Sequence, residues 1–199
     1  GVSSNSGWSK GATVYSKAGP LDALISANFV TERDYKDGNG YKVKNSALGQ
    51  RGLLAKLGFD LNENHRIEVS HRQERHYGVR ALREEFDFAQ DNDEANNAPR
   101  YRITQNDTTS VEWNGKNMGF VTNAKANVYH SEINRKEPSD NSKTRLIADG
   151  ANLNLESAVG QSHLVKYGVN YRSQEGKPNS LTVQNDVQMK TQKKRDVGV

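Results

Sequence analysis

The residues best suited to bind a ligand lie in the polar stretch 76–100, which separates two strand-like segments. His76 and Tyr77 open this stretch, and imidazole and phenolate are both ligands of ferric iron. The sequence therefore makes these two residues candidate metal ligands.

Basic and acidic side chains follow along the same stretch. The guanidinium groups could pair with an anionic ferric chelate such as a catecholate siderophore, and the carboxylates could supply oxygen ligands. The candidate ligand-binding set is His76, Tyr77, Arg80, Arg83, Glu84 and Glu85. Because charged loop residues are usually solvated, a loop held by its own ion pairs is the alternative for each of them.

Motifs of catalysis are missing from the chain. Its five histidines form no metal-binding spacing, and there is no HExxH, GxSxG, P-loop or dinucleotide-binding pattern. The chain has no cysteine, which excludes a disulfide framework, a thiolate metal site and a cysteine nucleophile. We expect no enzyme activity and no resident cofactor.

The composition is poor in apolar residues for a globular domain of this length. Only 33% of the 199 residues are hydrophobic, and the mean hydropathy is −0.92. Either much of the chain is disordered, or its apolar residues are spread over many strands with one apolar face. No apolar run approaches the roughly 20 residues of a spanning helix, which excludes a helical membrane protein.

The chain carries a net charge of +4 and an isoelectric point near 9.2. Its lysines and arginines are interleaved with acids, and no nucleic-acid-binding motif accompanies them, so we expect no nucleic-acid partner. The chain opens at Gly1 without a basic and apolar leader. For an exported protein, this indicates a mature or excised chain.

A period of two is clearest in residues 21–33. Leu21, Ala23, Ile25, Ala27 and Phe29 fall on one face. Polar residues, among them Asp22, Ser26 and Asn28, fall on the other. This alternation predicts a strand with one apolar and one polar face.

The same unit recurs along the chain, and short turns alternate with long loops. The predicted strands are 7–17, 21–33, 47–60, 65–75, 101–113, 119–133, 144–157 and 163–174, and 175–199 is predicted to be a truncated extracellular loop. Tilted spanning strands need about this length, and short periplasmic turns opposite long extracellular loops are typical of outer-membrane barrels. The predicted fold class is therefore all-β: about eight strands of an antiparallel up-and-down transmembrane β-barrel.

Aromatic residues support the membrane interpretation. Phe59, Trp113 and Phe120 are predicted on the apolar face at the short-turn end, with the short turn at Asn114–Asn117 in the hairpin that follows Trp113. Phe29 and Tyr171 are predicted on that face toward the loop end. Two aromatic girdles would explain this placement. Aromatic packing in a soluble core is the alternative.

Some polar residues share the parity of the apolar face. They are His71, Gln73, Gln105, Asp107 and Asp149, all toward the loop ends of their strands. A carboxylate facing lipid at mid-depth is costly. Either the strands continue beyond the bilayer, or a β-bulge resets the parity.

The opposite face carries lysines and arginines that would line the lumen. They are Lys56, Arg66, Arg72, Arg102 and Lys125. A basic wall of this kind could guide anionic chelates. Ordinary solvation of the lumen and contact with a plug are the alternatives.

Two blocks of sequence resemble the barrel of TonB-dependent receptors. Residues 45–60 (NSALGQRGLLAKLGFD) and 62–72 (NENHRIEVSHR) carry the generic strand–turn–strand pattern of that superfamily. Further segments look like its FrpB-like branch of iron-regulated receptors, which includes FetA-like and CopB-like proteins. These segments are 78–88 (GVRALREEFDF), 98–102 (APRYR), 111–121 (VEWNGKNMGFV) and 167–180 (YGVNYRSQEGKPNS).

The resemblance implies a bacterial outer-membrane receptor for ferric iron or a ferric siderophore. Such receptors have about 22 strands around a plugged lumen, and the TonB–ExbB–ExbD system energises them through the plug. Neither the plug nor a TonB box is recognisable here, so this chain would be one part of the barrel. The alternatives are a passive porin-like or structural barrel and, less favoured, a soluble β-rich interaction module.

Overall fold

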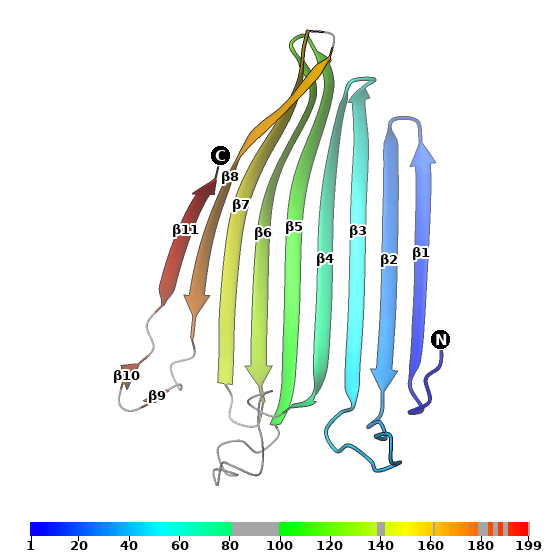
Figure 1. Cartoon of the computed structure of the whole chain (residues 1–199). Helices are drawn as coiled ribbons and strands as arrows, with labels where there is room; N and C mark the ends of the chain where they lie inside the picture. Colours follow the sequence, from blue (N-terminus) through cyan, green and yellow to red (C-terminus); the bar gives the residue numbers. More distant parts are fainter. Residues whose placement is uncertain are drawn as a thin grey trace.

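The computed structural model describes residues 1–80, 100–138, 142–160, 162–178, 183–184, 187–188 and 191–198, and all of its regular elements are strands (Figure 1). The strands are β1 (Trp8–Ala18), β2 (Leu21–Glu32), β3 (Leu48–Asn62), β4 (His65–Arg80), β5 (Arg100–Met118), β6 (Val121–Glu137), β7 (Ser142–Val159), β8 (His163–Lys177), β9 (Val183–Gln184), β10 (Val187–Gln188) and β11 (Gln192–Gly198). No helix in the described part of the chain is long and apolar enough to cross a membrane.

Nine strands form one antiparallel meander in the order β1-β2-β3-β4-β5-β6-β7-β8-β11, and β9 and β10 form a separate pair. Short turns gather at one end of the sheet and the longer connections at the other (Figure 1). Among the described residues, β1 pairs only with β2 and β11 only with β8, so the sheet is not closed. The predicted antiparallel up-and-down fold is confirmed.

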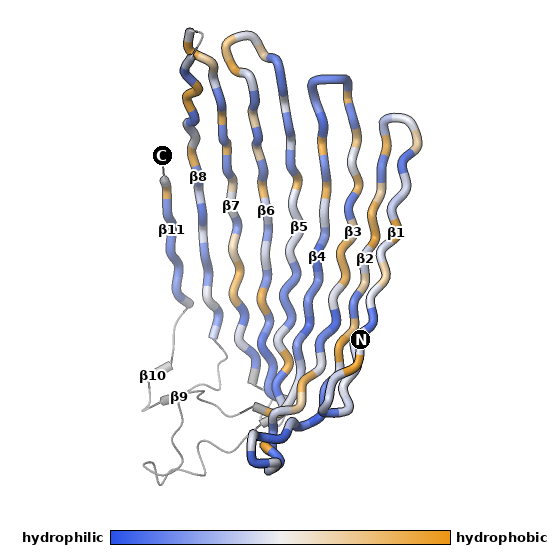
Figure 2. Tube along the Cα trace, turned by 45° about the vertical axis from the view of Figure 1, so that its right-hand side comes forward, coloured by the Kyte–Doolittle hydropathy of each residue, from blue (hydrophilic) through white to orange (hydrophobic). Residues whose placement is uncertain are grey.

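Along each strand, successive residues point to opposite faces of the sheet. Hydrophobic and hydrophilic residues are interspersed along the strands (Figure 2). Residues directly opposite each other in an antiparallel pair share a face. One row of such partners is apolar from β2 to β11: Ala23, Leu57, Val69, Val111, Val128, Ala151, Tyr171 and Val197. We call the face with this row the apolar face and the opposite one the polar face.

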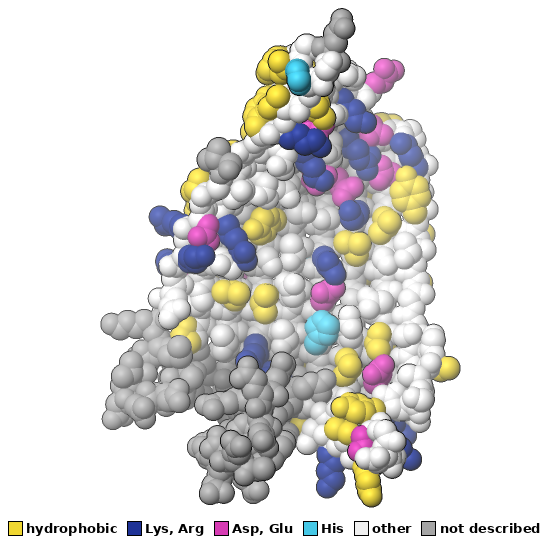
Figure 3. Space-filling view, in the orientation of Figure 1, with side chains coloured by type: hydrophobic (Ala, Val, Ile, Leu, Met, Phe, Trp, Pro, Cys, Tyr) yellow, Lys and Arg dark blue, Asp and Glu magenta, His cyan; other side chains and the backbone are white. Residues whose placement is uncertain are grey.

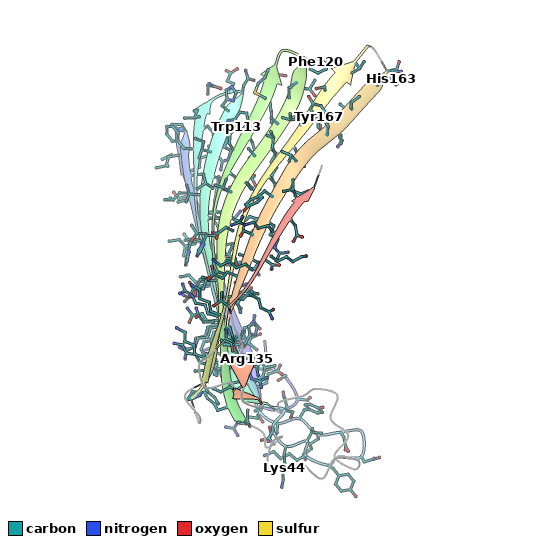
Figure 4. All side chains as sticks on the ribbon, turned by 90° about the vertical axis from the view of Figure 1, so that its left-hand side faces the viewer. Lys44, Trp113, Phe120, Arg135, His163 and Tyr167 are labelled. Carbon is teal, nitrogen blue, oxygen red and sulfur yellow. The ribbon has the colours of Figure 1, made fainter. Side chains whose placement is uncertain are left out.

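The apolar face is exposed rather than covered by another layer. Leu57 and Val128 are 56% and 54% exposed, although both are large aliphatic residues in the middle of the sheet. Seen from the side, the sheet is a single curved wall (Figure 4). A wall of this kind needs lipid or another apolar surface against it.

The apolar band slopes across the sheet. On β2 it covers Leu21–Phe29, whose row partners on β8 are Val169 and Lys177, whereas on β8 it covers Val165–Tyr171, so relative to the rows it is displaced toward the short-turn end. The row that contains Phe29 ends in β8 at Lys177, well outside the band. A slope is expected because barrel strands tilt by roughly 35–45°, so a level membrane cuts across the rows.

On their own strands, the polar residues that share the apolar parity lie on the loop side of the apolar run, although His71 and Gln73 pair with Ala55 and Leu53 of β3. Register shifts occur only between Asp60 and Asn62 and between Val121 and Asn123 in the described sheet, both near the short turns. No bulge therefore resets the parity near His71 or Asp107. Of the two explanations offered by the sequence, continued strands account for these residues.

Several predicted boundaries differ from the structure. The loop predicted to begin at His76 is strand as far as Arg80, because β4 keeps pairing with β5 above the apolar band. The turn predicted at Asn114–Asn117 lies further on, at Gly119 (φ 66°) and Phe120. Phe120 is therefore a turn residue, whereas Phe59 and Trp113 lie on the apolar face in line with Ile67.

The predicted terminal loop 175–199 is also different. β8 continues to Lys177, and β11 (Gln192–Gly198) returns to pair with it from Gly176 to Asn170. The charged residues of β11 obscured its period in the sequence. The structure thus adds a ninth strand to the eight that were predicted.

Candidate functional site

His76 and Tyr77, the predicted iron ligands, occupy consecutive positions of β4. His76 pairs with Gln50 and Thr104 on the polar face, whereas Tyr77 pairs with Gly49 and Ile103 on the apolar face. A Cβ added to Gly49 would come within 2.2 Å of the Tyr77 ring, so this ring covers the glycine. The two side chains point in opposite directions and cannot share one iron ion while the strand stays extended.

The other four residues of the predicted ligand set lie wholly or partly outside the part of the chain that the structure describes. Arg80 is the last residue of β4, and its side chain lies outside the described part. Arg83, Glu84 and Glu85 also lie outside the described residues. Their role in ligand binding stays a prediction.

The five predicted lumen residues all lie on the polar face, but every one of them has a carboxylate partner. The closest contacts are Lys56–Glu68 (2.8 Å), Arg66–Asp22 (2.7 Å), Arg66–Asp60 (2.8 Å), Arg102–Glu137 (2.9 Å), Lys125–Glu112 (2.9 Å) and Arg72–Glu74. Many of these charges gather toward the short-turn end (Figure 3). The wall is therefore charge-compensated rather than basic, which corrects the expectation of a cationic guide.

Two of those carboxylates lie directly opposite each other in the β4–β5 ladder. Glu68 and Glu112 would repel if left alone. The ammonium groups of Lys56 and Lys125 flank them, each 2.8–2.9 Å from one carboxylate. This alternation of signs keeps the polar face hydrated without a large net field.

The loop end of the polar face has its own ion cluster. Glu137 is 8% exposed and accepts hydrogen bonds from Arg102 Nε at 2.9 Å and Arg135 at 2.7 Å. One terminal nitrogen of Arg102 is buried without a hydrogen-bond partner among the described residues. Arg135 lies at this end of the sheet (Figure 4). His76 is in the same row, because both residues pair with Thr104.

The connection between β2 and β3 (residues 33–47) is a fixed hairpin-like loop. Asp37 accepts hydrogen bonds from the amides of Asn39 at 3.0 Å and Tyr41 at 2.8 Å, and Gly40 takes a positive φ of 87°. The backbones of Lys36 and Lys42, which flank this turn, form an isolated antiparallel β-bridge. The Asp37-Gly38-Asn39-Gly40 sequence is a turn signal, because these residues tolerate or stabilise the left-handed conformation.

Asp34 holds the base of this loop. Its Oδ1 accepts hydrogen bonds from the amides of Ser46 (3.0 Å) and Ala47 (2.9 Å), and Lys42 Nζ lies 3.4 Å from its Oδ2. The Ala47 amide, with Lys42 and Ser46, holds the pKa of Asp34 below its usual value. The backbone of the loop is thereby fixed at both its base and its tip.

Phenols and ammonium groups project from this fixed backbone. Tyr35 and Tyr41 are 50% and 73% exposed, and Lys36, Lys42 and Lys44 are exposed beside them. Lys44 lies on the hollow side of the curved sheet (Figure 4). None of these residues is among the predicted site residues, although two tyrosines, each followed by a lysine, around a turn are a sequence signal for an anion or iron site.

The polar face has a concavity near the short-turn end. A hollow of about 750 Å³ is lined by the polar side chains of Asn114, Asn123, Lys125, Asn154, Glu156 and Lys166, among others. Amide side chains can both donate and accept hydrogen bonds, so this surface suits a polypeptide backbone or a hydroxyl-rich molecule. Nowhere in the described ranges do three or more histidine, cysteine or acidic side chains cluster as metal ligands.

Comparisons with known proteins agree with this architecture. No family model matches the sequence, and no curated protein matches it. The solved FrpB iron transporter from Neisseria meningitidis does match. Its F3-3 variant superposes with a TM-score of 0.80 at 39% identity over 89% of this chain, and its F5-1 variant with a TM-score of 0.79 at 38% identity over the same share.

The apoprotein form of the F5-1 variant is also similar, with a TM-score of 0.75 and 36% identity. The matched region covers about 30% of each of the first two solved chains and 28% of the apoprotein. Because identity and fold agree over most of this chain, the likeness extends beyond a shared β topology. The chain belongs to the FrpB-like TonB-dependent receptors of the bacterial outer membrane and forms part of their β-barrel wall.

Proposed function

We propose that this chain is part of a receptor that takes up iron across the outer membrane, as ferric iron or a ferric siderophore. The observation that carries the proposal is the 39% identity to an FrpB iron transporter over 89% of the chain. The exposed apolar wall and the hydrated polar face support a barrel segment with a passage on one side.

The loop 33–47 is the described segment best suited to meet the ligand. Its tyrosine phenols can bind ferric iron as phenolates, and its lysines can attract the negative charge of a ferric catecholate. Hydrogen bonds to Asp34 and Asp37 hold the backbone in advance, which lowers the entropy lost on binding. His76, on the polar face at the same end of the sheet, is a further candidate for contact.

Energy for uptake would come from the TonB–ExbB–ExbD system, through a plug in the lumen. The asparagine-rich hollow and the paired charges of the polar face support such an occupant, because they offer hydrogen bonds without a strong net charge. A passive barrel would need neither TonB nor a plug. The two mechanisms are therefore separated by their energy dependence.

Ligand binding is tested on the purified outer-membrane protein that carries this chain. A double variant, Tyr35→Phe with Tyr41→Phe, removes both phenols and keeps both rings. Tyr15→Phe, on the polar face of β1 and 59% exposed, is the matched control. Ferric iron and a ferric catecholate are titrated for affinity, and the phenolate-to-iron absorption band is recorded in the titration with ferric iron alone, because the catecholate complex has a charge-transfer band of its own.

The double variant should lose the absorption band and bind at least roughly tenfold more weakly, whereas the control should bind like the parent. Unchanged binding and an unchanged band in the double variant would remove this loop from the proposed site. Absence of any binding by the parent protein would contradict the proposed iron ligand itself.

A further inference from the structure

Three cations lie on the apolar face on the loop side of the apolar runs: Lys10 and Arg51 border the runs of β2 and β3, and Arg75 follows His71 and Gln73 on β4. Lys10 pairs with Phe29, Phe29 with Arg51, and Arg51 with Arg75, so the four residues form one row across β1–β4. Arg51 and Arg75 are directly opposite each other. Like charges in this position repel unless an anion lies between or beside them.

No carboxylate offsets these charges on the same face of β1–β4. All acidic residues within those strands have the other parity: Asp22, Glu32, Asp60, Glu68 and Glu74. The next acid on this face is Asp107 in β5, whose two oxygens accept hydrogen bonds from Gln73 and Gln105. Lys10, Arg51 and Arg75 therefore have no ion pair among the described residues.

Cations further along the same row, on β7 and β8, do have acidic partners. Arg145 of β7 forms an ion pair with Glu132, and Lys177 of β8 forms one with Glu175 at 3.1 Å. The cations of β1–β4 thus differ from their counterparts in lacking an acid. One nitrogen of Arg75, its Nε, is also buried without a described hydrogen-bond partner.

Aromatic rings hold two of these cations in place. Trp8 stacks on Phe29 with ring centroids 4.9 Å apart, and Lys10 Nζ lies 4.5 Å from the Trp8 ring centroid. Arg51 lies 5.0 Å from the Phe29 centroid and 5.7 Å from that of Tyr77. These cation–π contacts fix the side chains of Lys10 and Arg51 and leave their N–H groups free to donate hydrogen bonds to an anion.

We propose that Lys10, Arg51 and Arg75 bind the phosphate of a phosphorylated glycolipid in the outer leaflet. Its acyl chains would lie on the exposed apolar runs of β2 (Leu21–Phe29) and β3 (Leu53–Phe59), which begin directly below the cations. The charge of the site matches a phosphate, and arginine binds phosphate through two parallel hydrogen bonds. Its place at the edge of the band matches the depth of a head group.

The test uses the detergent-purified outer-membrane protein that carries this chain. Native mass spectrometry measures the occupancy by bisphosphorylated lipid A and by its monophosphorylated form, with inorganic phosphate as a competitor. The test variant is Lys10→Gln with Arg51→Gln and Arg75→Gln. A control variant, Arg145→Gln with Lys177→Gln, removes cations from the same row that already have acidic partners.

The parent protein should retain bisphosphorylated lipid A, and the triple variant should bind it roughly tenfold or more weakly. The control variant should bind like the parent, and millimolar inorganic phosphate should not displace the lipid. A charge-preserving variant, Arg51→Lys with Arg75→Lys, keeps the positive charges but loses the paired hydrogen bonds of the guanidinium groups, so its affinity should lie between that of the parent and that of the triple variant. Heat-modifiable migration in gels verifies that each variant is folded.

Equal lipid A occupancy in the parent and the folded triple variant would overturn the proposal. Displacement by inorganic phosphate would also overturn it, because the site would then take a soluble anion. Loss of lipid in the control variant alone would move the site to β7 and β8. A concentration-dependent dimer that forms without lipid and disappears in the triple variant would show a second copy as the occupant instead.

Discussion

A cation placed on the apolar face should destabilise the barrel much more than one placed on the polar face at the same height. Val111 lies in the apolar row between Val69 and Val128 and is 40% exposed. Val111→Arg would put a guanidinium in the lipid, which costs about 2–4 kcal/mol near the mid-plane. This corresponds to roughly 30- to 900-fold in the folding equilibrium.

Its neighbour Ser110 provides the matched control. Ser110 faces the polar side, where its hydroxyl lies 2.8 Å from that of Ser70. Ser110→Arg would lose that hydrogen bond, at about 1 kcal/mol, and would place the new charge near the carboxylates of Glu68 and Glu112. The two variants add the same charge one residue apart.

The measurement is equilibrium urea unfolding of the full outer-membrane protein in lipid vesicles, followed by tryptophan fluorescence. Val111→Arg should lower the free energy of unfolding by about 1–3 kcal/mol more than Ser110→Arg does. Equal losses would refute the assignment of the faces. A larger loss for Ser110→Arg would show that the apolar face points away from lipid.

Two further variants test local features. Asp34→Asn should speed amide exchange at Ser46 and Ala47 at neutral pH, because the carboxylate accepts hydrogen bonds from both amides. The pKa of Asp34 is lowered in the folded protein, so the parent should keep this protection above the ordinary value of 3.8 and lose it as the pH falls below that value. An unchanged exchange rate in the variant would contradict the role of the carboxylate. Gly168→Ala should lower the free energy of unfolding by about 1–3 kcal/mol, because its Cβ would lie 2.3 Å from the Leu153 carbonyl oxygen. The control Gly176→Ala, whose Cβ would have its nearest neighbour at 4.0 Å, should change the free energy of unfolding by less than about 0.5 kcal/mol. Equal losses for the two variants in urea unfolding would contradict this packing.

The alternation of residues was enough to predict most of the sheet. A period of two in Leu21–Phe29 and Leu53–Phe59 assigns both strands and their faces, because the lipid side is apolar and the lumen side is polar. The same rule fails above the bilayer, where both faces are wet. Residues 76–80 of β4 and residues 192–196 of β11 therefore lacked a visible period, although they pair in register.

The candidate site was harder to predict because its geometry depends on where β4 ends and on the register between neighbouring strands. His76 and Tyr77 looked like a ligand pair in a loop, yet the extended backbone sends them to opposite faces. The pairing of Lys56, Arg66, Arg102 and Lys125 with acids depends on cross-strand register, whereas Arg72 pairs with Glu74 on its own strand. Arg66 and Asp22 are 44 residues apart in sequence, and no local pattern reveals their contact.

Turn chemistry explains one error and one missed opportunity. Asn114-Gly115 is a strong hairpin signal, but β5 continues past it, and Gly119 provides the positive φ at the turn. Conversely, Asp37-Gly38-Asn39-Gly40 does form a turn, and the tyrosines and lysines around it are the exposed groups of the described loop. Local turn signals become useful for function when the side chains beside them are considered as well.

The most direct test of the proposed function is uptake of radioactive iron by cells that produce the receptor carrying this chain, with and without functional TonB. The proposal predicts uptake that requires both the receptor and TonB, from ferric iron or from a ferric siderophore. Uptake that persists without TonB would indicate a passive barrel. Equal uptake with and without the receptor would contradict a role in iron transport.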